Sequence, residues 1–268
     1  MIDADAVQQR RVHPLVASQT ELIVAVAARA LVGKRRVFAG VGLPTLAVDL
    51  AQRTVAPGIE LIYESGVCGA HPASMPEGIG DSIIVTGSEA VIDMQALFGY
   101  VLQGGHIDVG FLGAAQIDRY GSLNTSLIGS WSHPSTRLPG AGGAPEIMMN
   151  AAEVFVIMRR HDRSSFPPAL DFCTSPSPVR ARESGLGIMP RGRGVSHVIT
   201  PLGVLTRGHA FDELTLTSVH EGVSIDQVRA ATGWELRVAD DVHVTDPPSS
   251  EHIRLLREEI DRVRLYLR

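Results

Sequence analysis

The stretch Leu61-Ile62-Tyr63-Glu64-Ser65-Gly66-Val67 joins a strand-like apolar run to a carboxylate and two small residues. A short run containing Ile and Tyr predicts a buried strand, and a charged side chain is almost never fully buried unless it is paired. We therefore expect Glu64 where this strand meets a cavity, with Ser65 and Gly66 forming a sharp exit that lets a ligand approach the main chain. The alternative is a Glu that ends an edge strand and points into solvent, and this stretch taken alone favours that alternative.

Length and composition are those of an ordinary globular chain. The sequence has 268 residues, of which 44% are hydrophobic and 20% charged, with 27 Gly and 16 Pro spread along it. Because single α/β domains of this size are common, we expect one domain over residues 1–268 with many tight turns. The formal net charge of −5 and the lack of a long Lys or Arg block give no basic field that would attract nucleic acid.

The cysteines and the N-terminal sequence bear on the cellular compartment. Cys68 and Cys173 are too few for a disulfide framework and lack the paired spacing of a zinc site. The N-terminus carries Asp3 and Asp5 where a secretory signal would have a basic region, and no apolar run reaches membrane-spanning length. These features predict a cytoplasmic protein with no metal site and no membrane contact.

Segments with strand patterns alternate with segments that have helix patterns, which favours an α/β fold with a mainly parallel sheet covered by helices. The expected strands, besides the opening stretch, are residues 36–39, 107–113, 153–158 and 213–219, the last one half-exposed. The expected helices are residues 20–31 with an N-cap at Thr20, a helix from about Pro44, and an amphipathic helix over 249–268. We expect the last helix to dock against the sheet, although its apolar stripe would also suit another subunit.

Two glycine-rich segments have the composition to present main-chain N–H groups to a ligand. The first, Gly40-Val41-Gly42-Leu43-Pro44, lies between a strand and a helix, where N–H groups can face an anion or a carbonyl oxygen. It lacks the third glycine of a dinucleotide fingerprint and the Lys of a P-loop, so a tight structural turn explains it equally well. The second, Leu138-Pro139-Gly140-Ala141-Gly142-Gly143-Ala144-Pro145, has the uncovered N–H groups that an oxyanion hole requires. A flexible loop would have the same composition.

In combination with Glu64, these segments resemble the β subunit of family I CoA-transferases. The segments that carry the resemblance are Glu64-Ser65-Gly66, Gly110-Phe111-Leu112-Gly113-Ala114-Ala115-Gln116-Ile117-Asp118, Arg119-Tyr120-Gly121-Ser122-Leu123-Asn124, Gly140-Ala141-Gly142-Gly143 and Thr200-Pro201-Leu202-Gly203-Val204. Each motif is weak by itself, but their order along the chain is similar to that in the family. The likeness is greatest to the glutaconate CoA-transferase branch and runs from about Thr20 to the final helix.

The resemblance implies roles for the matching residues. Glu64 matches the family's nucleophile, which attacks an acyl-CoA thioester and becomes a glutamyl-CoA thioester before a second carboxylic acid takes the CoA. An ionised carboxylate suits this role because it needs no base to activate it. Gly142 and Gly143 match the loop that stabilises the oxyanion and are assigned to catalysis. The residues assigned to substrate binding are Gly40, Gly42, Ser65, Gly66 and Gly140.

Partners and substrates are also implied by the resemblance. The family builds its active site between an α and a β subunit, so a separate α subunit is the expected partner, in a heterodimer or a larger αβ assembly. A CoA thioester is expected as substrate and a carboxylic acid, such as a dicarboxylate, as its co-substrate, with no tightly bound cofactor. Many members have Glu-Asn-Gly where this chain has Glu64-Ser65-Gly66, which leaves the substrate open. The alternative function is hydrolysis or decarboxylation of an acyl-CoA, which relatives perform mostly with an altered nucleophile.

Several other reactive side chains are weaker candidates. Cys68 lies near Glu64, but a small apolar Cys beside a cavity usually serves packing. His71 and Glu77 belong to a loop for which solvent exposure is the simpler expectation, although contact with the acyl carboxylate is the functional alternative. Gln116 and Asp118 are expected to stabilise a turn that leads to Asn124.

Overall fold

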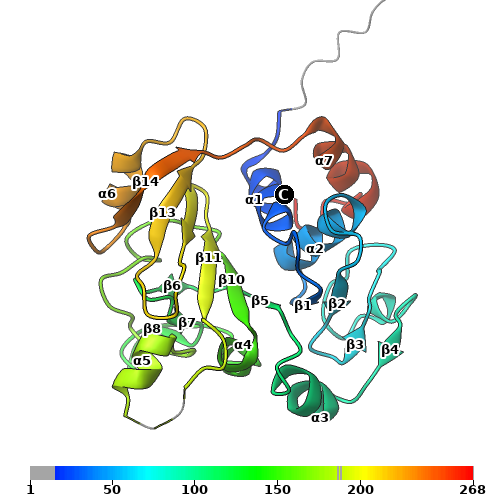
Figure 1. The fold of residues 1–268 in the computed structure, drawn as a ribbon, viewed down its shortest axis with the longest axis horizontal. Helices are drawn as coiled ribbons and strands as arrows, with labels where there is room; N and C mark the ends of the chain where they lie inside the picture. The colour runs from blue at the N-terminus through cyan, green and yellow to red at the C-terminus, as the bar shows by residue number, and fades with distance from the viewer. Residues whose placement is uncertain (1–15, 186, 188, 268) are drawn as a thin grey trace, which may run out of the picture.

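The computed structural model describes residues 16–185, 187 and 189–267 (Figure 1). The helical elements are α1 (Gln19–Arg29), α2 (Leu43–Arg53), η1 (Ser82–Ile84), α3 (Met94–Ala96), η2 (Leu97–Leu102), α4 (Ala144–Asn150), α5 (Pro178–Glu183), α6 (Ile225–Ala231), α7 (Ser250–Arg254) and η3 (Leu255–Ile260). The strands are β1 (Arg36–Phe38), β2 (Glu60–Ile62), β3 (Val67–Cys68), β4 (Ala90–Val91), β5 (Val109–Leu112), β6 (Gln116–Ile117), β7 (Leu123–Asn124), β8 (Leu127–Gly129), β9 (Pro134–Arg137), β10 (Glu153–Ile157), β11 (Val195–Ile199), β12 (Gly203–Thr206), β13 (Thr215–Val219) and β14 (Arg237–Val244).

A 10-stranded sheet with the order β14-β13-β12-β11-β10-β5-β1-β2-β3-β4 organises the fold. The strands from β11 to β2 in this order run parallel, as do β13 and β14, and the remaining neighbours pair antiparallel. Strand β1 pairs with β2 on one side and with β5 on the other, so the strand order reverses at β1. The expected α/β fold with a mainly parallel sheet is confirmed.

Alternate side chains of the central strands supply two separate hydrophobic clusters. Val37 and Phe111 belong to one cluster, which also contains the buried faces of α1 and α2. Phe38 and Leu112 belong to the other, together with Ile147 of α4. Because successive side chains of a strand point to opposite faces, the two clusters cover the two faces of the sheet. In Figure 1, α1, α2 and α7 lie together on one side of β1 and β2, and α3 and α4 lie on the other.

Both terminal helices differ from the sequence-based prediction, and α1 ends at Arg29 instead of residue 31. Helix α1 is capped by Ser18, whose side chain accepts a hydrogen bond from the Glu21 N–H while the Glu21 side chain accepts one from Ser18, so the N-cap is not Thr20. The C-terminal helix ends at Ile260 instead of continuing to residue 268. Its η3 segment packs against α2 and shares a hydrophobic cluster with Val37 and Leu61 of the sheet. Val263, which was expected on its apolar stripe, is 79% exposed.

The segment 114–124 forms a small hairpin, β6 and β7, where the sequence predicted only a turn. The expected roles of its polar residues are confirmed. The Asp118 carboxylate accepts hydrogen bonds from the N–H groups of Tyr120 and Ser122, both at 2.9 Å. The Gln116 side-chain oxygen accepts one from the Asn124 amide at 2.8 Å.

Candidate active site

A cavity of about 710 Å³ lies where the carboxyl ends of four adjacent parallel strands meet. Its wall includes a residue just after each of them: Gly40 follows β1, Glu64 follows β2, Gly113 follows β5 and Arg159 follows β10. In open α/β sheets, ligands bind outside the carboxyl ends of the strands at the point where the strand order reverses. The cavity beside β1 therefore has the position and the size of a small-molecule site.

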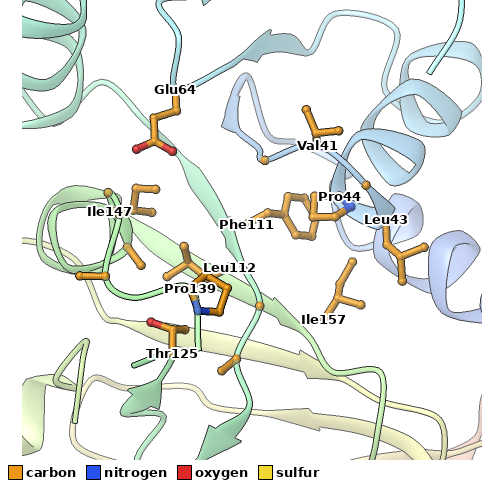
Figure 2. A pocket seen from close by; sticks show the side chains of 18 of the residues that line it. Val41, Leu43, Pro44, Glu64, Phe111, Leu112, Thr125, Pro139, Ile147 and Ile157 are labelled. Carbon is orange, nitrogen blue, oxygen red and sulfur yellow. The ribbon is translucent and has the colours of Figure 1, made fainter. Parts of the chain in front are cut away.

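Glu64 lies at the tip of the turn that joins β2 to β3. The Tyr63 N–H donates to the Val67 carbonyl and the Gly66 N–H donates to the Tyr63 carbonyl, both at 2.9 Å, which closes the turn. Tyr63 itself is fully buried, so the turn is anchored immediately before the carboxylate. Figure 2 shows the Glu64 carboxylate directed toward the cavity. It forms no hydrogen bond or ion pair with the residues that the structure describes, so both oxygens are available to a ligand.

The loop before α4 forms the wall nearest to Glu64. Gly140 is held on Thr125, because its N–H donates to the Thr125 carbonyl at 2.9 Å and the Thr125 hydroxyl donates to its carbonyl at 2.7 Å. Gly140 and Gly142 have φ angles of 104° and 50°, a backbone region that favours glycine. Within the described part of the chain, the N–H groups of Gly142 and Gly143 have no hydrogen-bond acceptor. This loop therefore offers two unused donors at the cavity wall.

Gly143 and Glu64 approach each other closely although they are far apart in the sequence. A Cβ atom at Gly143 would lie 2.8 Å from Glu64 Oε1 and 2.8 Å from Phe98 Cζ. Real Cβ atoms do not come this close to other heavy atoms, so a side chain at position 143 would displace the carboxylate or the ring. The absence of a side chain here gives the Glu64 carboxylate its place beside the glycine loop.

Gly40 and Gly42 line the same cavity at the start of α2. Gly42 is the N-cap residue of this helix and has a φ angle of 118°, which explains why glycine occupies the position. The Gly40 carbonyl accepts a hydrogen bond from the Thr45 hydroxyl at 3.1 Å, which ties the turn to the helix. The structure thus brings five of the glycines predicted for the site, and Glu64, to one cavity: Gly40, Gly42, Gly140, Gly142 and Gly143.

Ser65 and Gly66 are not among the residues that line this cavity. A Cβ at Gly66 would lie 1.9 Å from the Ile92 carbonyl oxygen, so this glycine permits close packing of the turn on the neighbouring chain segment. The Ser65 hydroxyl is buried and has no partner among the described residues. Their role in substrate binding stays a prediction.

The weaker candidates lie outside the cavity. Cys68 is buried in β3, where burial raises the pKa of its thiol and disfavours the reactive thiolate. His71 and Glu77 are exposed and do not line the cavity. In the described parts of the chain, no group of His, Cys, Asp or Glu side chains could hold a metal ion. Nor does any helix in those parts have the length and apolar character needed to cross a bilayer.

Three cavity residues with polar side chains were missed by the sequence analysis. Arg159 follows β10, and the rule that ligands bind at the carboxyl ends of parallel strands was a signal that could have found it. Thr125 fixes the glycine loop, and Tyr266 reaches the cavity from the C-terminal segment, with its hydroxyl donating to the Pro76 carbonyl at 2.6 Å. Nothing in the local sequence around Tyr266 indicates this long-range contact.

Known proteins share both the sequence and the fold of this chain. The β subunit of 3-oxoadipate CoA-transferase from Pseudomonas knackmussii is 41% identical over 240 residues, which cover 90% of this chain and 92% of that protein. The β subunit of glutaconate CoA-transferase from Acidaminococcus fermentans is 32% identical over 232 residues, with 84% and 85% covered. The expected likeness to the glutaconate branch is therefore present, and the identity to the 3-oxoadipate protein is higher.

Two solved structures extend the comparison. The crystal structure of glutaconate coenzyme A-transferase from Acidaminococcus fermentans matches with a TM-score of 0.87 and 26% identity, covering 96% of this chain and 99% of that one. The decarboxylase AibA/AibB matches with a TM-score of 0.79 and 24% identity, covering 93% and 97%, which is a similarity of fold alone. The coenzyme A transferase family model matches residues 20–231. The family and the transferase class expected from the sequence motifs are confirmed, and the chain belongs to the coenzyme A transferase family.

Proposed function

We propose that this chain is the β subunit of a heteromeric CoA-transferase that moves CoA between an acyl-CoA and a carboxylic acid, with Glu64 as the nucleophile. The observation that carries the proposal is the unpartnered Glu64 carboxylate beside Gly143, in a loop whose Gly142 and Gly143 N–H groups are unused within the described residues. A nucleophile next to preorganised donors is the arrangement that acyl transfer requires.

The reaction begins when a Glu64 oxygen attacks the thioester carbonyl carbon. The carbon–sulfur bond breaks, the CoA thiolate leaves, and a mixed anhydride joins the acyl group to Glu64. The thiolate then attacks the glutamyl carbonyl, which releases the first carboxylate and leaves a Glu64–CoA thioester. The acceptor acid repeats these steps in reverse and leaves as its CoA thioester, which regenerates the Glu64 carboxylate.

The glycine loop acts on the charge that develops in these steps. Each attack converts a carbonyl oxygen into an oxyanion, and the Gly142 and Gly143 N–H groups are the donors assigned to it. Because glycine has no side chain to cover these N–H groups, a substrate oxygen can approach them closely. The CoA thioester is a substrate in this scheme, and the chemistry needs no tightly bound cofactor.

The relatives support a substrate class and a partner for this chain. The proteins named for 3-oxoadipate and for glutaconate act on dicarboxylic acids, which supports a dicarboxylate as one of the two acids here. Each of these relatives is named as one subunit of its enzyme, which supports a separate α subunit as the partner of this chain. We expect the active complex to form when the two subunits are co-expressed.

The first test is to trap the glutamyl-CoA thioester. The co-purified αβ complex is incubated with an acyl-CoA, treated with borohydride, and the peptide that contains Glu64 is mapped by mass spectrometry. The proposal predicts reduction at Glu64 that depends on the acyl-CoA. The Glu64→Gln complex should show no reduction, and the Glu77→Gln complex, altered at an exposed carboxylate outside the cavity, should behave like wild type. Consumption of the acyl-CoA with Glu64 unmodified would instead support hydrolysis or decarboxylation.

A further inference from the structure

Four of the residues that line the cavity carry polar side chains, Glu64, Thr125, Arg159 and Tyr266. Two of them are already committed. The Thr125 hydroxyl donates to the Gly140 carbonyl at 2.7 Å, and the Tyr266 hydroxyl donates to the Pro76 carbonyl at 2.6 Å. Glu64 and Arg159 are therefore the two polar side chains of the wall that have no hydrogen-bond or ion-pair partner among the described residues.

Arg159 lies just beyond the carboxyl end of β10, where it is exposed. It forms no hydrogen bond or ion pair with any residue in the described part of the chain. Besides the first cavity it lines a second one of about 500 Å³, and the two cavities also share Ala114 and Ala115. In Figure 2, Glu64 lies on the opposite side of the cavity from Ile157, which precedes Arg159 by two residues in the chain.

Much of the remaining cavity wall is apolar. Phe111, Leu112 and Ile157 line it and provide contacts for a short methylene chain. A guanidinium remains protonated at all accessible pH values and pairs with a carboxylate through two parallel hydrogen bonds. An acyl group with its thioester at Glu64 and a carboxylate at its far end would match this distribution of groups.

We infer that Arg159 binds the distal carboxylate of the acyl group and thereby selects dicarboxylic over monocarboxylic substrates. This inference rests on the proposed function, because it places the reacting carbonyl at Glu64. A monocarboxylic acyl group of the same length fills the apolar wall but leaves Arg159 without a partner. Selection therefore comes from one ion pair formed away from the reacting atoms.

The test compares two six-carbon donors, adipyl-CoA and hexanoyl-CoA, in single-turnover formation of the Glu64 thioester. In the Arg159→Gln complex, the second-order rate constant with adipyl-CoA should fall by about tenfold to a hundredfold. This fold-change corresponds to the free energy that one hydrogen-bonded ion pair contributes. The constant with hexanoyl-CoA should stay within about threefold of wild type. Arg159→Lys keeps the positive charge but lacks the planar guanidinium with its two parallel donors. Its rate constant with adipyl-CoA should lie between those of wild type and Arg159→Gln.

The matched control is Arg160→Gln. Arg160 is the neighbouring arginine, but it lines the second cavity and not the first. Its substitution should leave the ratio of the two rate constants unchanged. The inference is overturned if Arg159→Gln slows both donors equally, if it slows neither, or if wild type does not prefer adipyl-CoA.

A binding measurement separates this inference from the proposed chemistry. Calorimetric titration of the Glu64→Gln complex with adipate and hexanoate needs no thioester formation. Adding Arg159→Gln should weaken adipate binding by about tenfold or more and leave hexanoate binding unchanged. If wild type forms no glutamyl thioester, the nucleophile is wrong, and this titration still decides the role of Arg159.

Discussion

At the scale of single residues, Gly143 controls the position of the nucleophile. Its φ angle of −82° is accessible to alanine, so Gly143→Ala should preserve the fold. The added Cβ would meet Glu64 Oε1 and the Phe98 ring at 2.8 Å and push the carboxylate aside. Because a displacement of about 1 Å can cost a hundredfold in rate, we expect kcat/KM to fall by roughly tenfold to a hundredfold.

The control for this substitution is Gly58→Ala. Gly58 lies outside the cavity, and an added Cβ there would meet no heavy atom within 4 Å. It should retain wild-type kcat/KM. Thermal unfolding of both variants shows whether the Gly143→Ala defect is local, and an unchanged kcat/KM in Gly143→Ala would contradict the assigned position of Glu64.

Shortening the nucleophile tests the same geometry from the other side. Glu64→Asp keeps the negative charge but withdraws the carboxylate by roughly 1.5 Å, the length of one carbon–carbon bond. We expect thioester formation to slow by about a hundredfold or more, because the oxygen no longer reaches the carbonyl beside Gly142 and Gly143. Rapid-quench measurement of the Glu64–CoA thioester tests this directly. Near-normal rates with Asp would mean that the carboxylate acts only through its charge.

The sequence predicted which chemical groups the candidate site contains better than it predicted which residues line the cavity. Glu64 and the glycine loops could be named because their residue types and order are informative without coordinates. Arg159 could have been found from its place after a predicted strand, whereas Tyr266 reaches the cavity only through the arrangement of the C-terminal segment. Ser65 and Gly66 are adjacent to Glu64 in sequence, yet the turn at Glu64 places them off the cavity wall.

At the scale of elements, the contact between β5 and α4 positions the glycine loop. A Cβ at Gly110 would lie 2.2 Å from Ile147 Cγ2, so glycine lets the helix pack directly on the strand. Gly110→Ala should destabilise the complex by about 1–3 kcal/mol through overpacking and should also lower kcat/KM by moving α4. Urea unfolding and steady-state kinetics measure the two effects.

A double-mutant cycle identifies the cause of that effect. Ile147→Ala removes the clashing methyl group but leaves a cavity, which costs about 2–5 kcal/mol by itself. Gly110→Ala with Ile147→Ala should therefore be more stable than the sum of the single effects predicts, since each change offsets the other. Strict additivity would show that Gly110 acts through something other than its contact with Ile147.

The C-terminal segment illustrates why an element boundary escaped sequence analysis. The apolar spacing continues through Val263 and Leu267, which favours a longer helix. The buried Asp261 carboxylate instead accepts hydrogen bonds from the N–H groups of Leu265, Tyr266 and Leu267 at 2.7 to 3.0 Å. A side chain that accepts hydrogen bonds from several nearby N–H groups competes with the helix. The spacing of apolar residues in the sequence does not reveal this competition.

This turn also carries a prediction. Asp261→Ala leaves three N–H groups without their acceptor, and we expect a loss of about 2–4 kcal/mol in the free energy of unfolding, with lower kcat/KM because Tyr266 leaves the cavity wall. Asp226→Ala, at a carboxylate that is 93% exposed, should change stability by less than about 0.5 kcal/mol. Urea unfolding of the two variants measures both values, and comparable losses would contradict the role of Asp261.

At the scale of the whole molecule, the sheet explains why distant segments form one site. The strands β2, β1, β5 and β10 are neighbours and parallel, so the loops after them open on the same edge. The alternation of strands and helices was sufficient to predict the mainly parallel sheet. The strand order was not predictable, because pairing of β1 with β5 across about 70 intervening residues depends on tertiary packing of the Val37 and Val109 region.

Histidines with lowered pKa values predict how the stability of the molecule depends on pH. Burial lowers the pKa of His161 and of His197 to about 4, from an ordinary value of 6.5. Below pH 6.5 the unfolded chain binds protons at these positions while the folded chain does not, so stability is complete above pH 6.5 and is lost as the pH falls toward 4. Each histidine contributes at most about 1.4 kcal/mol per pH unit across this window.

Thermal unfolding of the complex between pH 7 and 4 tests this dependence. The unfolding midpoint should begin to fall near pH 6.5, and His197→Gln should flatten the decline because one of the histidines with a lowered pKa is gone. Carboxylates affect stability at lower pH than these histidines do. Hydrogen bonds from Ser164 and Ser165 lower the pKa of Asp162 to about 2, so its contribution to stability is lost only in stronger acid. A midpoint that stays constant down to pH 4.5 would assign the acid sensitivity to such carboxylates and contradict the role of the histidines.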